Sequence, residues 1–218
     1  MSRPLAAVLF DLDGVIVDTA SLHFAAWKRL AETLRIEFDA GRNQALKGVD
    51  RMASLDLLLG PAAGRYSDAE KQRMAEMKNR WYVQSLETIG AKDLLPGVEA
   101  AIAQVRRAGL GVALASASRN AATVVDRLGI VGCFDAIMDP AGIARGKPAP
   151  DLFLAAARRL RARPETCLGV EDAAAGIAAL KAAGMASVGV GSREVLHGAD
   201  WVVPDLTHFQ LSHYRSAA

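Results

Sequence analysis

Short apolar runs alternate with segments of helical periodicity along most of this chain, and this alternation restricts the possible fold more than any other feature of the sequence. The order is typical of an α/β protein whose strands form a parallel sheet. The expected strands are Ala6–Phe10, Gly111–Ala115, Ala136–Met138, Cys167–Val170, Ser187–Val190 and Trp201–Val203. The expected helices between them are Val98–Ala108, Ala121–Leu128, Asp151–Leu160 and Ala174–Ala183. We therefore predict an α/β core in which helices cover a parallel sheet.

The stretch between the first two expected strands breaks this alternation, because it shows helical periodicity and no convincing strand. Ser21–Leu34 places apolar side chains on one helical face, and Ser67 begins a capping box ahead of a further helix. We predict that residues 18–92 form an α-helical cap domain inserted into a discontinuous core of residues 1–17 and 93–218. Ligand sites often form in the crevice where two domains meet.

Four carboxylates follow the ends of two expected strands. Asp11 and Asp13 come directly after the first strand, and Glu171 and Asp172 come after the fourth. Ligands bind outside the carboxyl ends of the strands in an open parallel sheet, so we expect these side chains to converge at one edge. Carboxylates that lie so close repel one another unless a cation lies between them. Hard oxygen ligands with an open side suit Mg²⁺, which we predict as the cofactor.

The polar residues at the other strand ends suit a phosphate group. Ser116 follows the second strand, Asn120 precedes a helix whose first N–H groups can face an anion, and Lys147 lies beyond the third strand. With a phosphate in place, Asp11 can attack it as the nucleophile and form an aspartyl phosphate. Asp13 can then serve as general acid and base for the leaving or attacking hydroxyl.

The charge balance argues against several classes of protein. The formal net charge of the 218 residues is +2, whereas a nucleic-acid-binding protein usually has a concentrated basic face. Glu70–Arg80 mixes both signs and is interpreted as a solvated helix face. The N-terminal apolar run is too short for a signal peptide or a membrane span, and Cys133 and Cys167 are typical of buried thiols in a reducing compartment. We expect a soluble cytoplasmic monomer that binds no nucleic acid and no membrane.

Four motifs, taken together and in this order, resemble the haloacid dehalogenase superfamily of phosphotransferases. They are "DLDGV" with Asp11 and Asp13, "SAS" with Ser116, "GKPAPD" with Lys147, and "GVED" with Glu171 and Asp172. The resemblance implies a Rossmann-like core with Ser116 and Lys147 as further catalytic residues. It also implies a magnesium site formed by Asp11, the backbone carbonyl of Asp13 and Asp172, with Glu171 close by.

The cap resembles more specifically a branch of this family that isomerises sugar phosphates. The likeness lies in "DGVIVDTASLHFAAWKRLAE", "LKGVDR", "ALASASRN" and "GKPAPDLFLAAA". It implies substrate-binding roles for residues of both domains: His23, Trp27, Lys47, Gly48, Arg51, Lys78, Ser116, Ala117, Ser118, Arg119 and Asn120. Two residues depart from the family pattern. Asp50 replaces a small hydroxyl residue beside a proposed phosphate-binding arm, and Arg119 replaces a lysine; either could shift the sugar preference.

Structural roles compete with functional ones at several cap positions. His23 lies on the buried face of its helix and could be a packed core histidine. Lys78 lies on an otherwise apolar stripe, so its ammonium could either extend to solvent or reach a ligand. Lys47 and Arg51 could be ordinary loop charges, and Ser118 could cap the helix that follows it.

Three functions fit these residues to different degrees. The leading hypothesis is a mutase, and the resemblance implies that it converts β-D-glucose 1-phosphate into D-glucose 6-phosphate through an aspartyl phosphate and β-glucose 1,6-bisphosphate. The alternative is a sugar-phosphate phosphatase with the same Asp11 chemistry, which admits water. A phosphate-binding protein without catalysis is disfavoured, because binding alone does not need the Asp11/Asp13 pair. Arg51 and Lys78 suit a second, distal phosphate and favour the mutase.

Overall fold

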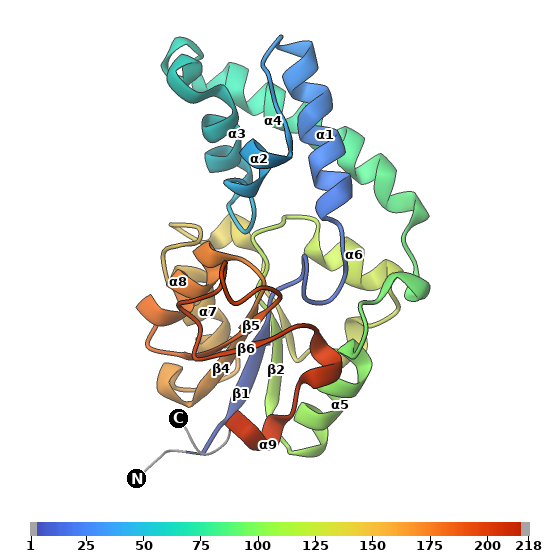
Figure 1. Ribbon diagram of the computed structural model, residues 1–218, viewed down its shortest axis with the longest axis vertical. Helices are drawn as coiled ribbons and strands as arrows, with labels where there is room; N and C mark the ends of the chain where they lie inside the picture. The colour runs from blue at the N-terminus through green and yellow to red at the C-terminus, as the bar shows by residue number, and fades with distance from the viewer. Residues whose placement is uncertain (1–3, 215–218) are drawn as a thin grey trace.

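The computed structural model describes residues 4–214 and shows a parallel sheet with helices on both faces and a group of helices above its carboxyl edge (Figure 1). The strands are β1 (Ala7–Phe10), β2 (Gly111–Leu114), β3 (Ala136–Ile137), β4 (Cys167–Glu171), β5 (Ala186–Val190) and β6 (Trp201–Val203). They are arranged in the order β3-β2-β1-β4-β5-β6, and each neighbouring pair is parallel. The predicted α/β class, with a Rossmann-like sheet and a helical insertion, is confirmed.

The helices divide between the insertion and the sheet. Those of the insertion are α1 (Ala20–Thr33), α2 (Ala40–Gln44), α3 (Arg51–Leu59) and α4 (Asp68–Ser85). Those around the sheet are α5 (Val98–Arg107), α6 (Ala121–Arg127), α7 (Asp151–Arg159), α8 (Ala174–Ala182) and the short C-terminal α9 (Leu211–Tyr214). The predicted strands and sheet-covering helices agree with the structure to within one residue at each end.

The central strand explains why its sequence is a continuous apolar run. All four residues of β1 are fully buried, since the sheet is covered on both faces. Val8 and Phe10 belong to the apolar cluster that includes residues of α5 and α6, and Ala7 and Leu9 belong to the cluster that includes residues of α7 and α8. A strand buried in this way has no exposed face for a polar residue, so the first carboxylates come only after it ends.

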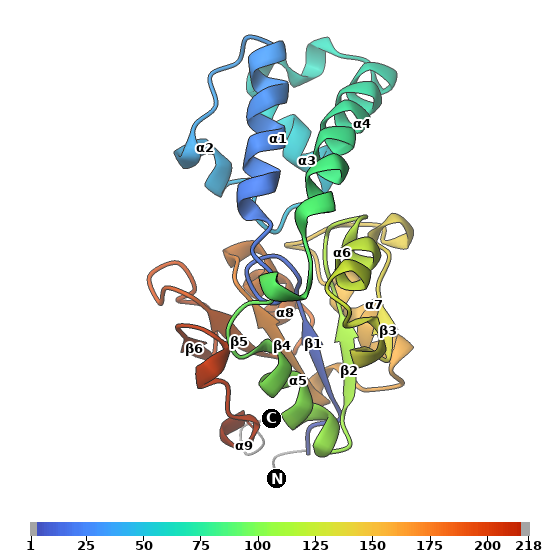
Figure 2. The same cartoon turned by 90° about the vertical axis from the view of Figure 1, so that its right-hand side faces the viewer.

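The inserted helices have an apolar core of their own. Trp27 and Leu30 of α1 belong to one buried cluster with Leu55 and Leu58 of α3. Figure 2 shows these helices as a separate group above the carboxyl edge of the sheet. The two connections to the core lie side by side, because Val17 forms an isolated bridge with Leu94. The exact domain limits given above stay a prediction.

Several details differ from the sequence-based interpretation. The helices α2 and α3 were not anticipated individually. Glu70–Arg80 is not wholly solvated, because Lys78 within it is only 3% exposed. Cys167 is buried as expected, but Cys133 is only half-buried. Within residues 4–214, no helix combines the length and the apolar character needed to cross a membrane.

Candidate active site

The base of the site lies at the carboxyl end of β1, where the strand order of the sheet reverses direction. Asp11 directly follows β1, and its backbone N–H donates a 2.9 Å hydrogen bond to the carbonyl of Val170 in β4. Ser116 lies two residues beyond β2, and Glu171 is the last residue of β4. The topology thus brings motifs from distant parts of the sequence to one edge of the sheet.

Lys147 connects two of the carboxylates at this edge. Its Nζ donates to Asp11 Oδ1 at 2.6 Å and to Glu171 Oε1 at 2.5 Å, and all three side chains are almost completely buried. Burial alone would lower the pKa of Lys147, but the two carboxylates outweigh it and raise the pKa above its ordinary value. The ammonium therefore stays charged at neutral pH and offsets part of the negative charge of the two carboxylates.

The carboxylates provide a donor set that fits a divalent cation. One oxygen from each of Asp11, Glu171 and Asp172 lies within 4.8 Å of the others. Burial first, followed by the neighbouring carboxylates Glu171 and Asp11, raises the pKa of Asp172 to about 8. Asp172 receives no hydrogen bond from any residue in the described range 4–214. Closely spaced carboxylates that repel one another, with Asp172 lacking a donor, suit a hard cation with oxygen ligands.

Gly14 allows the loop after Asp13 to approach this donor set. Its φ is +78°, a conformation that favours glycine, and a Cβ at this position would lie 2.2 Å from Asp172 Oδ2. Any larger residue would push the loop and Asp172 apart. The "DG" of the first motif is therefore explained by close packing against the last motif.

Asp13 points to a different neighbour. Thr19 at the start of the cap donates a hydrogen bond to Asp13 Oδ1, and the Asp13 carboxylate is not part of the three-carboxylate cluster. Burial, followed by Asp11, raises the pKa of Asp13 to about 7. A carboxyl group with a pKa near neutrality can both donate and accept a proton at physiological pH.

The loop after β2 is organised by its own serines. Ser116 is buried, and its Oγ accepts a 3.0 Å hydrogen bond from the backbone N–H of Ser118. Ser118 Oγ in turn accepts from the N–H of Asn120 at 3.2 Å. Ser118 thus supports the turn that precedes α6 and lines the pocket, but it does not cap the helix as the structural alternative proposed, because the N-cap is Asn120.

On the cap side, Lys78 and His23 form a buried pair. Lys78 Nζ lies 2.7 Å from His23 Nδ1, and it also lies over the rings of Trp27 and Tyr82 at 4.7 and 4.8 Å. The Lys78 side chain does not extend to solvent. Burial first, followed by the charge of Arg51, lowers its pKa to about 7. His23 Nε2 is buried without a hydrogen-bond partner among residues 4–214, which indicates that the pair can still accept or donate toward a ligand.

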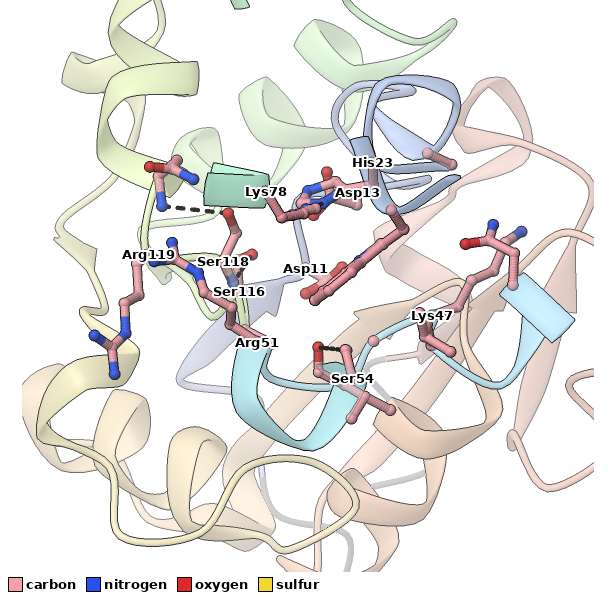
Figure 3. Close-up of a pocket in the computed structure, with 18 of the residues that line it drawn as sticks. Asp11, Asp13, His23, Lys47, Arg51, Ser54, Lys78, Ser116, Ser118 and Arg119 are labelled. Carbon is pink, nitrogen blue, oxygen red and sulfur yellow. Dashed lines mark hydrogen bonds between the residues drawn. The ribbon is translucent and has the colours of Figure 1, made fainter. Parts of the chain in front are cut away.

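Arg51 begins α3 and projects toward the core loop. Its Nη2 donates to Asn79 Oδ1 at 2.9 Å. Burial, followed by the nearby charge of Arg119, lowers its pKa. In Figure 3, Arg51 and Arg119 lie together on one side of Asp11, and Lys47 lies on the other. Cations therefore surround the opening above the carboxylates.

Asp50 has a structural role that the sequence did not reveal. Its Oδ1 accepts from the backbone N–H groups of Met52 at 2.9 Å and Ala53 at 3.1 Å, so it is the N-cap of α3. It forms no ion pair with Arg51. The negative charge of Asp50, expected beside the phosphate-binding arm, therefore interacts with the N-terminus of α3.

One pocket between the cap and the core brings the predicted substrate-binding residues together. They are His23, Trp27, Lys47, Gly48, Arg51, Lys78, Ser116, Ala117, Ser118, Arg119 and Asn120. Asp11, Asp13 and Asp172 line the same pocket, whereas Lys147 and Glu171 do not. The roles of these residues stay predictions, but their juxtaposition is a property of the structure.

Sequence reasoning missed other lining residues: Ala20, Asn43, Leu46, Val49, Ser54 and Asn79. Ala20, Leu46 and Val49 lie within the quoted motifs but were not singled out, and Asn43, Ser54 and Asn79 lie outside them. All six lie in the helical insertion, where the pattern indicated only a helical core. Asn79 had one available signal, because it directly follows Lys78 in a stretch that was interpreted as solvated.

The comparison with known proteins first establishes the class. Residues 5–184 match the family model described as "haloacid dehalogenase-like hydrolase". The chain therefore belongs to the haloacid dehalogenase-like hydrolase family and is an enzyme of that type.

Individual relatives then narrow the likeness. The chain is 46% identical over 220 residues to the β-phosphoglucomutase of Bacillus subtilis (strain 168), with 97% of each chain covered. The solved β-phosphoglucomutase of Clostridium difficile matches with a TM-score of 0.94 and 42% identity, over 97% of this chain and 96% of that one. A phosphorylated carbohydrates phosphatase of Thermotoga maritima is 30% identical over 183 residues, or 83% of this chain and 82% of its own. The predicted resemblance is confirmed.

Proposed function

We propose that this enzyme is a mutase that converts β-D-glucose 1-phosphate into D-glucose 6-phosphate through an aspartyl phosphate and β-glucose 1,6-bisphosphate. The observation that carries the proposal is a pocket with carboxylates at one end and arginines at the other. Asp11, Asp13 and Asp172 line one end, with Lys147 bound to Asp11 behind them. Arg51 and Arg119 line the other end and have no carboxylate at ion-pair distance among residues 4–214. The B. subtilis relative named β-phosphoglucomutase supports the same function.

Asp11 is suited to be the nucleophile. Lys147 donates to Oδ1 and fixes the orientation of the carboxylate, and no residue in the described range donates to Oδ2. A carboxylate oxygen of Asp11 attacks phosphorus, the bond from phosphorus to the sugar oxygen breaks, and the phosphoryl group is carried by Asp11. In the second half-reaction a sugar hydroxyl attacks the same phosphorus and releases the carboxylate.

Asp13 supplies and removes the proton in these steps. With a pKa raised to about 7 by burial and by Asp11, it can protonate the departing sugar oxygen and later accept the proton of the attacking hydroxyl. Thr19 fixes the orientation of its carboxyl group through a hydrogen bond. Thr19 lies where the chain enters the cap, so cap position and the orientation of Asp13 are connected.

We also propose Mg²⁺ as the cofactor, held by Asp11, the backbone carbonyl of Asp13 and Asp172, with Glu171 close by. When bound, the cation offsets the negative charge of the phosphoryl group. Glu171 mainly orients other groups, because its oxygens accept from Lys147 at 2.5 Å and from the N–H of Ala173 at 3.0 Å.

The cap residues bind the rest of the substrate in this proposal. Arg51 and Arg119 bind the distal phosphate, since a guanidinium can form paired hydrogen bonds with phosphate oxygens. The buried pair of His23 and Lys78 faces the sugar hydroxyls, and Lys47 lies at the far side of the opening. A molecule carrying a phosphate at either end can thus be held in both orientations.

A sugar-phosphate phosphatase is the second candidate, favoured by the T. maritima relative named as a phosphatase. The two activities differ in the fate of the aspartyl phosphate, which a sugar hydroxyl consumes in a mutase and water consumes in a phosphatase. The test is to incubate the protein with β-glucose 1-phosphate, Mg²⁺ and a trace of the bisphosphate. Glucose 6-phosphate in large excess over inorganic phosphate supports the mutase, and inorganic phosphate as the main product refutes it.

A further inference from the structure

Asn79 joins the cap to the core through a single oxygen atom. It lies in α4, and its Oδ1 accepts hydrogen bonds from Arg51 Nη2 and from Asn120 Nδ2, both at 2.9 Å. Arginine can only donate, so the Asn79 atom must be the carbonyl oxygen, and the Asn120 atom must then be its amide nitrogen. The hydrogen-bond pattern therefore fixes the orientation of both amides.

Arg51 depends on this contact for its position. Within residues 4–214 it has no carboxylate at ion-pair distance, and the nearby guanidinium of Arg119 repels it. Among residues 4–214, its guanidinium donates its hydrogen bond to Asn79. A long side chain with five donors and no anchor would lose its orientation, and ordering it again would reduce binding affinity.

Asn120 gives the contact its second function. It belongs to the core loop that includes Ser116 and Ser118, and it immediately precedes α6. The Asn79 carbonyl can receive both hydrogen bonds only when the cap lies over the core as in this structure. Arg51 is consequently oriented relative to the core loop, and not merely within the cap.

We propose that Asn79 is a positioning residue that orients the Arg51 guanidinium against the core loop, so that the distal phosphate of the substrate is bound only in this arrangement of cap and core. The part that concerns the distal phosphate rests on the proposed function. Asn79 itself acts through Arg51 and takes no part in phosphoryl transfer.

Kinetics of Asn79→Ala provide the first test. We expect the KM for β-glucose 1-phosphate to rise about tenfold, as for the loss of a hydrogen bond to a charged group, with a much smaller change in kcat. Gln84→Ala is the matched control, because Gln84 is an exposed amide on the same helix and does not line the pocket. A fall in kcat with an unchanged KM would overturn the proposal.

A double-mutant cycle tests whether Asn79 acts through Arg51. In an Arg51→Ala background, Asn79→Ala should change the KM for total consumption of β-glucose 1-phosphate less than twofold. Additive costs would overturn the proposal. Because total consumption counts both glucose 6-phosphate and inorganic phosphate, the cycle remains informative if the enzyme proves to be a phosphatase.

A substrate-free measurement completes the test. The ¹⁵N relaxation of the Arg51 Nε–H group, assigned with Arg51→Lys, should show an ordered side chain in the parent protein and a mobile one in Asn79→Ala. An unchanged heteronuclear NOE would overturn the proposal whatever reaction the enzyme catalyses. If only the mutase assay fails, the proposed function is refuted. The role of Asn79 is then decided by the relaxation of the Arg51 Nε–H group.

Discussion

Asp172 is a carboxylate whose negative charge is unfavourable in the folded chain when no cation is bound. Its pKa is raised from 3.8 to about 8, so the folded protein binds this proton more tightly than the unfolded chain does. Its contribution to stability is therefore fully present below pH 3.8 and is lost as the pH rises through about 8. An asparagine in its place would carry no charge at any of these pH values.

We expect Asp172→Asn, in EDTA, to gain thermal stability relative to the parent protein as the pH rises from 5 to about 8, and to gain little more above that. Added Mg²⁺ should stabilise the parent at pH 8 more than the variant. Calorimetry across this range checks both effects, with Asp126→Asn, an exposed carboxylate on α6, as the control. If the difference in Tm between Asp172→Asn and the parent does not change with pH, the charge of Asp172 does not destabilise the folded protein.

Asp13 should be separable from the metal site. Its side chain turns to Thr19 and not to the other carboxylates. Asp13→Asn should therefore reduce turnover by about 10²–10⁴-fold, as for the loss of a general acid and base. Mg²⁺ affinity, measured by calorimetric titration, should stay close to that of the parent. A large loss of affinity would mean that the Asp13 carboxylate, and not only its carbonyl, contacts the ion.

The start of α3 depends on a close approach between cap and core. A Cβ at Gly146 would lie 2.8 Å from Oδ2 of Asp50, the residue that caps this helix. Overpacking of this kind typically costs about 1–3 kcal/mol. Because the contact joins the two domains, the cost should reduce substrate affinity more than it lowers the Tm of the core.

We expect Gly146→Ala to raise the KM for the sugar phosphate, and Asp50→Ser to suppress that effect. Serine can still cap the helix but is one atom shorter. Gly142→Ala is the matched control, since a Cβ there meets nothing within 4 Å. Steady-state measurement of KM for the single and double variants tests this coupling. Equal effects of Gly146→Ala in the parent and in the Asp50→Ser background would show that the two positions are not coupled.

The strands of the core could be predicted well, because a strand buried on both faces appears in the sequence as a continuous apolar run. The four residues of β1 are all apolar, and their burial is complete. The start of α3 could not be predicted in the same way. "LKGVDR" was interpreted as a loop, since Asp50 was compared with a phosphate-binding arm and not considered as an N-cap. A capping residue and a ligand-binding residue have the same polar character, and only the three-dimensional contacts distinguish them.

At the scale of the whole molecule, the site was predictable where motifs follow strand ends and unpredictable where the cap closes over them. The topology of a parallel sheet dictates that Asp11 and Glu171 meet at one edge. No comparable rule dictates which side chains of an inserted helical domain face the core. Asn79 and Ser54 were missed for this reason, because helical periodicity identifies a buried face but not what covers it.

The two-ended pocket makes a final prediction about Arg51. Asp50 is engaged at the helix terminus and does not neutralise Arg51, so the guanidinium is available to a distal phosphate. Arg51→Ala should reduce kcat/KM for β-glucose 1-phosphate by about one to two decades, which corresponds to about 1.5–3 kcal/mol for a charge-assisted contact. Hydrolysis of acetyl phosphate should fall much less, because that substrate has no distal phosphate.

Both activities should be measured in one preparation, with Arg65→Ala, an exposed arginine of the cap, as the control. Arg51→Lys should give an intermediate loss, since lysine retains the charge but cannot form the forked pair of hydrogen bonds. An equal fall in both activities of Arg51→Ala would mean that Arg51 supports cap closure and does not bind the distal phosphate. An unchanged mutase rate would remove the main reason, on the cap side, to prefer a mutase over a phosphatase. A selective loss would show that this enzyme recognises its substrate from both ends, as the exchange of a phosphoryl group between two hydroxyls of one sugar requires.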